Sequence, residues 1–192
     1  LDALTTGDYN TVVGARAASN LATSSKNTFI GSYSGVLTTA GNENTAVGNA
    51  SLQASGGYRN SVLGADAGKS ITGNNNICIG QKSGDNITSG AGNVIIGTNV
   101  DADAVDSART LKIVGDDGST TTTWITGDNS GNLTFAADVT LGDDLLLDSD
   151  SAVLKFGDDQ DVTLTHTDGT GLTLNSTSKL TFGDAATYIN QS

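Results

Sequence analysis

A five-residue motif recurs six times in the first hundred residues, and it constrains the fold more than any other feature of the chain. Each copy consists of Asn, a small or β-branched residue, two apolar residues and Gly. The copies are Asn10–Gly14, Asn27–Gly31, Asn44–Gly48, Asn60–Gly64, Asn76–Gly80 and Asn93–Gly97. Successive copies lie 16 or 17 residues apart. A period this short and regular predicts one structural unit stacked on copies of itself.

The composition agrees with short strands joined by many tight turns. The 192 residues include 25 Gly and no Pro, and 36% of them are hydrophobic. Gly, Asn, Ser, Thr and Asp are the residues that turns favour. Because the apolar residues are periodic and often β-branched, the chain does not have the pattern of a disordered segment. We therefore expect an all-β protein.

The charge of the chain excludes several classes of partner. The formal net charge is −12, and the nine Lys and Arg residues are scattered. Such a chain is not expected to bind nucleic acid or to insert into a membrane, and no stretch is long and apolar enough to span one. The single cysteine, Cys78, falls at the third position of the motif, where we interpret it as a small buried hydrophobe. The first residue is Leu1, so we expect a segment of a longer or processed protein.

The motif predicts which side chains face inward. The fourth position is aliphatic in every copy, and the second position points the same way in a strand. We therefore expect these two positions to face a core. A coil of 16 or 17 residues has room for two short strands and two turns. The third position, which is also mostly apolar, then faces outward, and we expect it to meet the same face of an identical chain.

The other motif positions have simpler interpretations. Gly at the fifth position fits a sharp corner where a Cβ atom would clash. Asn at the first position can turn the chain and hydrogen-bond the Asn of the next coil, which predicts an asparagine ladder. A small residue follows three positions after each of the first five of these glycines. These residues are Ala17, Ser34, Ser51, Ala67 and Ser83.

The copies resemble two known groups of fibrous proteins. The wording Asn-Thr-x-apolar-Gly is similar to the head repeat of trimeric autotransporter adhesins, a left-handed parallel β-roll. It is still more similar to the tail-fibre repeats of marine-type bacteriophages. The resemblance covers about residues 7–100. The autotransporter repeat is usually shorter and has an extra Ala, and only Asn44–Gly48 comes close to that wording. The resemblance implies a stacked parallel β-roll in a homotrimer.

The β-roll repeat module is expected to cover residues 1–100, because the repeat breaks near Asn99. Residues 101–131 are expected to form a connector, with a helix or loop first and then two strands around the turn at 115–118. Trp124 is expected to be a packing anchor between modules. Residues 132–192 contain Leu-x-Phe-small segments and alternating apolar runs, which predict an intertwined trimeric β-fibre shaft. The segments are Leu133–Ala136, Leu154–Gly157 and Leu180–Gly183.

No catalytic residue is expected. The paired acids Asp116 and Asp117, Asp143 and Asp144, and Asp158 and Asp159 all lie next to Gly, as solvated turn residues do. His166 is a candidate for an ion site on a threefold axis. No cofactor is expected. A stacked column of Thr11, Thr28 and Thr45 is similar to ice-binding solenoids, but its expected inward direction argues against that role.

The function expected from these features is mechanical. We expect a segment of a tail-fibre-like homotrimer that projects or forms a host-attachment surface, located on a virion or another extracellular surface. Tyr33, Tyr58 and Arg59 are candidate receptor contacts, because exposed Tyr and Arg can stack on a sugar. Three alternatives remain open: a bacterial trimeric adhesin head, a polysaccharide depolymerase and a self-assembling extracellular filament.

Overall fold

The computed structural model describes residues 6–54, 56–148, 152–156, 162–167 and 171–174, and the described residues form strands, turns and loops without any helix. It divides into two compact units, Leu1–Val139 and Thr140–Ser192. The first unit contains a nine-stranded sheet and the second a three-stranded sheet. The prediction of an all-β chain is confirmed for this part of the sequence.

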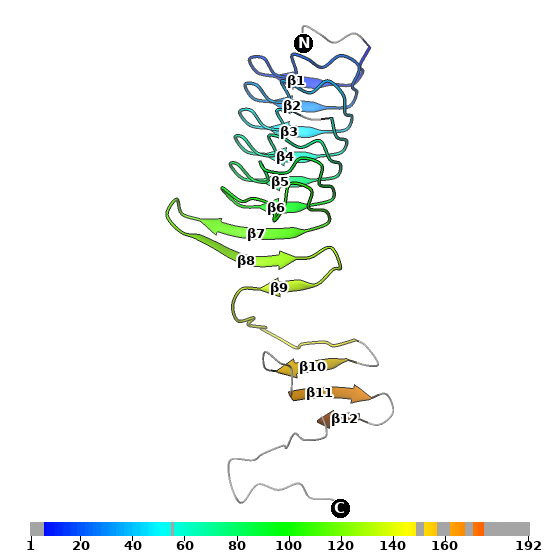
Figure 1. Cartoon of the computed structure of the whole chain (residues 1–192), viewed down its shortest axis with the longest axis vertical. Helices are drawn as coiled ribbons and strands as arrows, with labels where there is room; N and C mark the ends of the chain where they lie inside the picture. Colours follow the sequence, from blue (N-terminus) through cyan, green and yellow to red (C-terminus); the bar gives the residue numbers. More distant parts are fainter. Residues whose placement is uncertain (1–5, 55, 149–151, 157–161, 168–170, 175–192) are drawn as a thin grey trace, which may run out of the picture. The chain divides into compact units, whose positions relative to one another are not determined.

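The nine strands of the first sheet follow one another in chain order, β1 to β9 (Figure 1). The strands are β1 Thr11–Val13, β2 Thr28–Ile30, β3 Thr45–Val47, β4 Ser61–Leu63, β5 Ile77–Ile79, β6 Val94–Ile96, β7 Leu111–Asp116, β8 Thr121–Gly127 and β9 Leu133–Phe135. Neighbours are parallel from β1 to β7 and antiparallel from β7 to β9. The stacked parallel coil predicted from the repeat is therefore present.

The register between coils keeps every motif position above its own copy. Thr11 pairs with Thr28 and Val13 with Ile30, and the same positions stay aligned in each later pair. The stack continues one step beyond the last motif, because β7 pairs in parallel with β6. Residues 101–109, which precede β7, form turns and loop without helix. Each coil thus serves as the template for the next.

Each coil contains one strand, not the two that we predicted. The other side of the coil is a run of turns that still hydrogen-bonds its neighbour through the backbone, as when Tyr33 N donates to Ala15 O at 2.9 Å. Residues on this side adopt positive φ, for example 55° at Arg16 and 46° at Ala18. A left-handed residue bends the chain and cannot belong to a strand.

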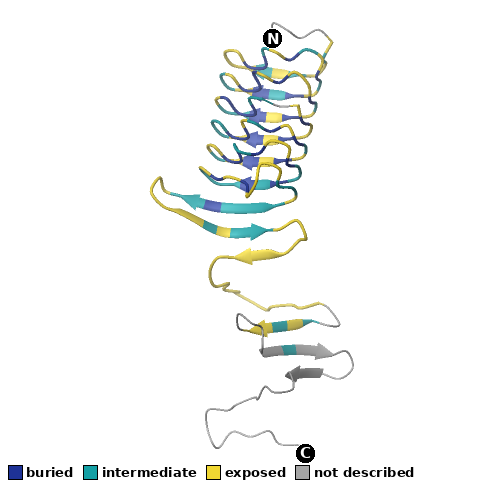
Figure 2. Ribbon diagram, viewed as in Figure 1, coloured by how far each residue is buried: buried dark blue, intermediate teal, exposed yellow. Residues whose placement is uncertain are grey.

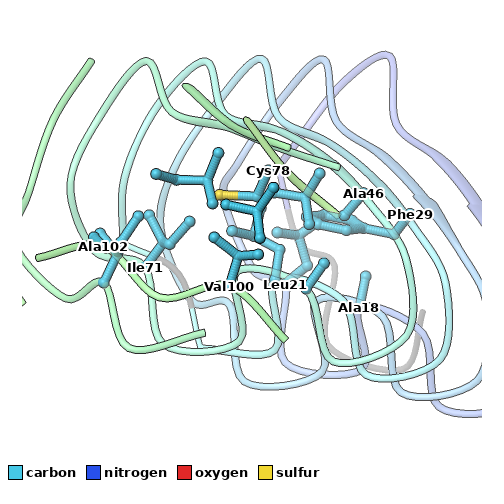
Figure 3. Packing of buried hydrophobic residues seen from close by; sticks show 14 residues of the cluster. Ala18, Leu21, Phe29, Ala46, Ile71, Cys78, Val100 and Ala102 are labelled. Atoms are coloured by element: carbon cyan, nitrogen blue, oxygen red, sulfur yellow. The ribbon is translucent and has the colours of Figure 1, made fainter. Parts of the chain in front are cut away.

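The inward face of the strands is the reverse of our prediction. The third motif position is buried, whereas the second and fourth positions face outward, including the column of Thr11, Thr28 and Thr45 that we expected to point inward. The buried residues are Phe29, Ala46, Val62, Cys78 and Ile95, each at most 2% exposed. They form a row that belongs to one hydrophobic cluster with Leu21, Ile71, Ile87 and Ala67, and Figure 3 shows this cluster. A coil this narrow has space for only one such row.

Side-chain sizes in this row are fitted to the space inside the coil. Phe29 is the largest buried side chain, and it lies against Gly35, where an added Cβ would come 2.6 Å from the ring. Its stacking partner in the next coil is Ala46. Protein interiors are close-packed, so a large residue needs small neighbours. This complementarity explains why the third position varies more in size than the fourth.

The second unit contains an antiparallel three-stranded sheet. Its strands are β10 Val153–Phe156, β11 Val162–Thr167 and β12 Gly171–Leu174, paired in that order. The predicted segment Leu180–Gly183 lies outside the described residues. Short antiparallel strands agree with the predicted strand content of this region, while the intertwined trimer remains a prediction.

Candidate functional surface

The predicted asparagine ladder runs along the inside of the stack. The side-chain oxygen of Asn44 accepts from the backbone N–H of Asn60 at 2.9 Å and from the Asn60 amide at 3.1 Å. The Asn60 amide also donates to the carbonyl of Gly73 at 3.0 Å. The same three bonds recur at each step. The ladder residues are Asn10, Asn27, Asn44, Asn60, Asn76 and Asn93, and Thr110 takes the last position.

The ladder fixes each coil to the next. From Asn27 to Asn93 these side chains are fully buried, so each lost hydrogen bond would leave a polar group without water. The glycine corners add a second restraint, because a Cβ at Gly64 would overlap the carbonyl oxygen of Gly80 in the next coil. Both features hold the spacing between coils to that of a β-sheet. The result is a rigid unit with a regular outer surface.

The outward face of the nine-stranded sheet carries no charged side chain. In the parallel coils it consists of the second and fourth motif positions. These residues are Thr11, Val13, Thr28, Ile30, Thr45, Val47, Ser61, Leu63, Ile77, Ile79, Val94, Ile96, Leu111 and Ile113. Many are well exposed, with Val13 at 58% and Leu63 at 51%. An uncharged and largely apolar surface on a chain with net charge −12 is a candidate interaction site.

The same face continues into the antiparallel strands. Ile113 pairs with Ile125 of β8, and Ile125 pairs with Phe135 of β9. Directly opposite residues share one face of a sheet. Leu111, Gly127 and Leu133 align in the same way. We call this surface, from Thr11 and Val13 to Leu133 and Phe135, the apolar strip. Figure 2 shows buried residues in β2–β6 and half-buried or exposed residues in β8 and β9.

Sequence reasoning missed the extent of the apolar strip. The interpretation of residues 101–131 as a connector separated β7 and β8 from the coils. A signal was present, because Thr110 lies 17 residues after Asn93, the spacing of the repeat. Lys112 occupies the third position there and reaches Asp103 at 2.7 Å and the carbonyl of Asp101 at 2.9 Å. A lysine at a position that is otherwise apolar concealed that this predicted strand continues the stack of coils.

The corners of the coils carry the charged residues. One column precedes each ladder asparagine, and its members have positive φ, such as 61° at Lys26 and 57° at Arg59. Lys26 lies 3.6 Å from Glu43 in the next coil, and the side chain of Arg59 donates to Asn75 at 2.9 Å. These side chains are exposed, so each contact contributes little to stability. The charged corners therefore flank the apolar strip without entering it.

The predicted receptor residues lie at two different corners. Tyr33 follows a glycine corner, is 39% exposed and lies under the Arg16 guanidinium, 5.8 Å from its ring centre. Tyr58, 43% exposed, and Arg59 precede a ladder asparagine at the other end of a strand. The structure thus exposes all three side chains but does not bring Tyr33 together with the other two.

The carboxylates of the acidic β7–β8 turn accept hydrogen bonds from the turn itself. Hydrogen bonds from the Thr121 hydroxyl and from Gly118 N–H lower the pKa of Asp116. Bonds from Thr120 and Ser119 N–H lower the pKa of Asp117. These groups stabilise the β7–β8 turn as carboxylates. Asp158 and Asp159 lie outside the described residues.

The remaining candidates from the sequence have these positions. His166 pairs with Leu172 in the backbone of β11 and β12, and its side chain lies outside the described part of the structure. Among the described residues, no three His, Cys, Asp or Glu side chains gather to hold a metal ion. Trp124 is 55% exposed and lies against Gly115 within the β7–β8 hairpin. Cys78 is fully buried, and burial raises the pKa of its thiol to about 12.

Comparisons with known proteins add no relative. No protein-family model, curated protein or solved structure matches the chain. In the part of the chain that the structure describes, no helix has the length and apolar character needed to cross a bilayer.

Proposed function

We propose that this chain is a structural segment of a homotrimeric extracellular fibre, similar to a phage tail fibre, that projects or forms a host-attachment surface. The observation that carries the proposal is the apolar strip on a self-templated stack of coils. The stack supplies a stiff unit, and the strip supplies a surface that excludes water only when identical chains share it. A virion tail or another extracellular surface is the proposed location.

The apolar strip is long and narrow. Nine strands at about 4.8 Å and three residues at about 3.3 Å give a strip of about 38 Å by about 10 Å. Such a strip can close around an axis parallel to the stack, where each copy faces its neighbours along its whole length. The choice of three copies rests on the resemblance of the repeat to those of homotrimeric fibres.

Attachment would use the corners that the apolar strip leaves exposed in a trimer. Tyr33 with Arg16, and Tyr58 with Arg59, combine an aromatic face with a cation, which suits a sugar that carries a carboxylate. We propose these corners as contacts with a cell-surface glycan. Replacing Tyr58 and Arg59 by Ala should weaken binding on a glycan array while leaving the mass of the particle unchanged.

The decisive experiment is the molar mass of the purified chain in solution, measured over a range of concentrations. The proposal predicts three times the 19.3 kDa of one chain, together with particles of uniform length in electron micrographs. A single compact chain at all concentrations, or filaments of indefinite length, would refute it. Turnover of a capsular polysaccharide by the pure protein would favour the depolymerase instead.

A further inference from the structure

We infer that the strands β7–β9 hold the three copies together, whereas the first coils contribute little to their association. The inference rests on the trimer proposed above and assigns the part of the apolar strip that carries its contacts. The occupants of the strip are two further copies of this chain. Three features of the described residues support this assignment.

The first feature is that β8 and β9 have no core of their own. No residue of either strand is buried in the single chain, and Leu133 and Phe135 are 58% and 47% exposed. Their other face carries Thr126 and Thr134, which suit water. An antiparallel ribbon of this size needs a covered apolar face to be stable. Because the coils do not cover that face, it is available to the other copies.

The second feature is a change of chemistry along the apolar strip. In β1–β4 the second motif position is Thr or Ser, so each strand offers one aliphatic side chain beside a hydroxyl. In β5, β6 and β7 the same position is Ile77, Val94 and Leu111, so each of these strands offers two. The favourable free energy of apolar association is proportional to the apolar area that is removed from water. The C-terminal half of the strip therefore contributes most of it.

The third feature identifies the occupant as the chain itself. Identical chains with net charge −12 repel one another wherever their charged corners approach. The apolar strip carries no charge from Thr11 to Phe135, so it is the surface where such chains can approach at least cost. Rotation about an axis parallel to the stack brings each strand level with its own copies. Ile113, Ile125 and Phe135 would then meet their equivalents at matching heights.

The test compares charge substitutions on the two ends and the two faces of the sheet in the full chain. Ile125→Glu places a carboxylate in the apolar strip at β8, and Thr126→Glu places it on the opposite face of the same strand. Thr11→Glu places it in the strip at β1. The readouts are molar mass against concentration and the reactivity of the buried Cys78 thiol, which reports whether the coils remain folded.

We expect Ile125→Glu to raise the concentration of half-dissociation by at least about 100-fold, as loss of a central contact does. Thr126→Glu and Thr11→Glu should change it by less than about threefold. Cys78 should stay unreactive in all three. If Ile125→Glu exposes Cys78, Phe135→Thr provides a milder variant in the last strand, with an expected shift of about tenfold.

Two outcomes would overturn the inference, and they differ from failure of the proposed function. The assignment to β7–β9 would be wrong if the trimer survives Ile125→Glu. It would also be wrong if Thr11→Glu or Thr126→Glu dissociates the trimer as readily as Ile125→Glu does. In both cases the fibre proposal would still stand. An unsubstituted chain that is monomeric at every concentration refutes the trimer and, with it, this inference.

Discussion

The side-chain oxygen of Asn27 accepts two hydrogen bonds from Asn44, one from the backbone N–H at 2.9 Å and one from the amide at 3.2 Å. The side-chain oxygen of Asn44 in turn accepts the same two hydrogen bonds from Asn60. Each asparagine is therefore both the acceptor for the following coil and the donor to the preceding one. Because the groups are fully buried, the ladder is a chain of mutually dependent bonds.

Asn60→Ala should lower the free energy of unfolding by about 2–4 kcal/mol. The substitution leaves the Asn76 N–H and the Gly73 carbonyl without their partners, and each buried unpaired group costs about 1–3 kcal/mol. Chemical unfolding at a fixed protein concentration measures the change. Asn49→Ala is the matched control, because Asn49 is exposed and donates only one side-chain bond, to Ser32 O at 3.3 Å. Equal losses in both variants would contradict a structural role for the ladder.

Gly64→Ala should be among the most damaging single substitutions, with a loss of at least about 3 kcal/mol. The backbone at Gly64 has φ +142°, which a residue with a side chain rarely adopts, and the new methyl would overlap the Gly80 carbonyl. Thermal unfolding measures the loss. Gly56→Ala should stay within about 0.5 kcal/mol, since nothing lies within 4 Å of its added Cβ. A benign Gly64→Ala would mean that the coils can move apart.

These two predictions concern features that the sequence already contained. The period, the asparagine column and the glycine corners follow from residue type and spacing alone, because each requires a particular residue at one point of every coil. Which side of each strand faces the interior did not follow from the sequence. In Ile77-Cys78-Ile79 both faces are apolar, so alternation carries no information about which one is inside. Only the space inside the coil, visible in the pairing of Phe29 with Ala46, decides it.

The functional surface was partly beyond the sequence for a different reason. The structure buries the third motif position and exposes the second and fourth. The outward apolar face that we predicted for the third position therefore lies on the other side of the strands. Its continuation through Ile125 and Phe135 depends on the antiparallel register of β7–β9. A register between strands of different length cannot be read from a repeat. The contacts of the proposed trimer also depend on how several copies are arranged, which the sequence of one chain does not contain.

The positive-φ corners had no sequence signal, and they allow a stabilising substitution. Lys82 is exposed and has φ 53°, a conformation that costs a residue with a side chain roughly 1–2 kcal/mol. Lys82→Gly removes that strain but adds freedom to the unfolded chain, for a net gain of about 0.5 kcal/mol. Gln81→Gly, at an exposed neighbour outside this conformation, should instead lose about 0.5–1 kcal/mol. The unfolding midpoint should rise in Lys82→Gly and fall in Gln81→Gly. A lower midpoint in both variants would refute the argument.

The single cysteine predicts a loss of stability at high pH. Burial raises the pKa of the Cys78 thiol from 9.0 to about 12, so the folded chain keeps a proton that the unfolded chain releases. Stability from this group is complete below pH 9 and falls as the pH rises toward 12, by on the order of 1.4 kcal/mol per pH unit.

Cys78→Val isolates this contribution from the other groups that titrate at high pH. Valine already occupies the equivalent position in the preceding coil, where Val62 stacks on Cys78, so the variant should fold with a change of less than about 1.5 kcal/mol at pH 7. Between pH 9 and pH 11 the variant should lose stability less steeply than the parent chain, as measured by urea unfolding. Parallel curves would mean that the thiol ionises without unfolding the coil, and hence that water reaches the interior of the stack.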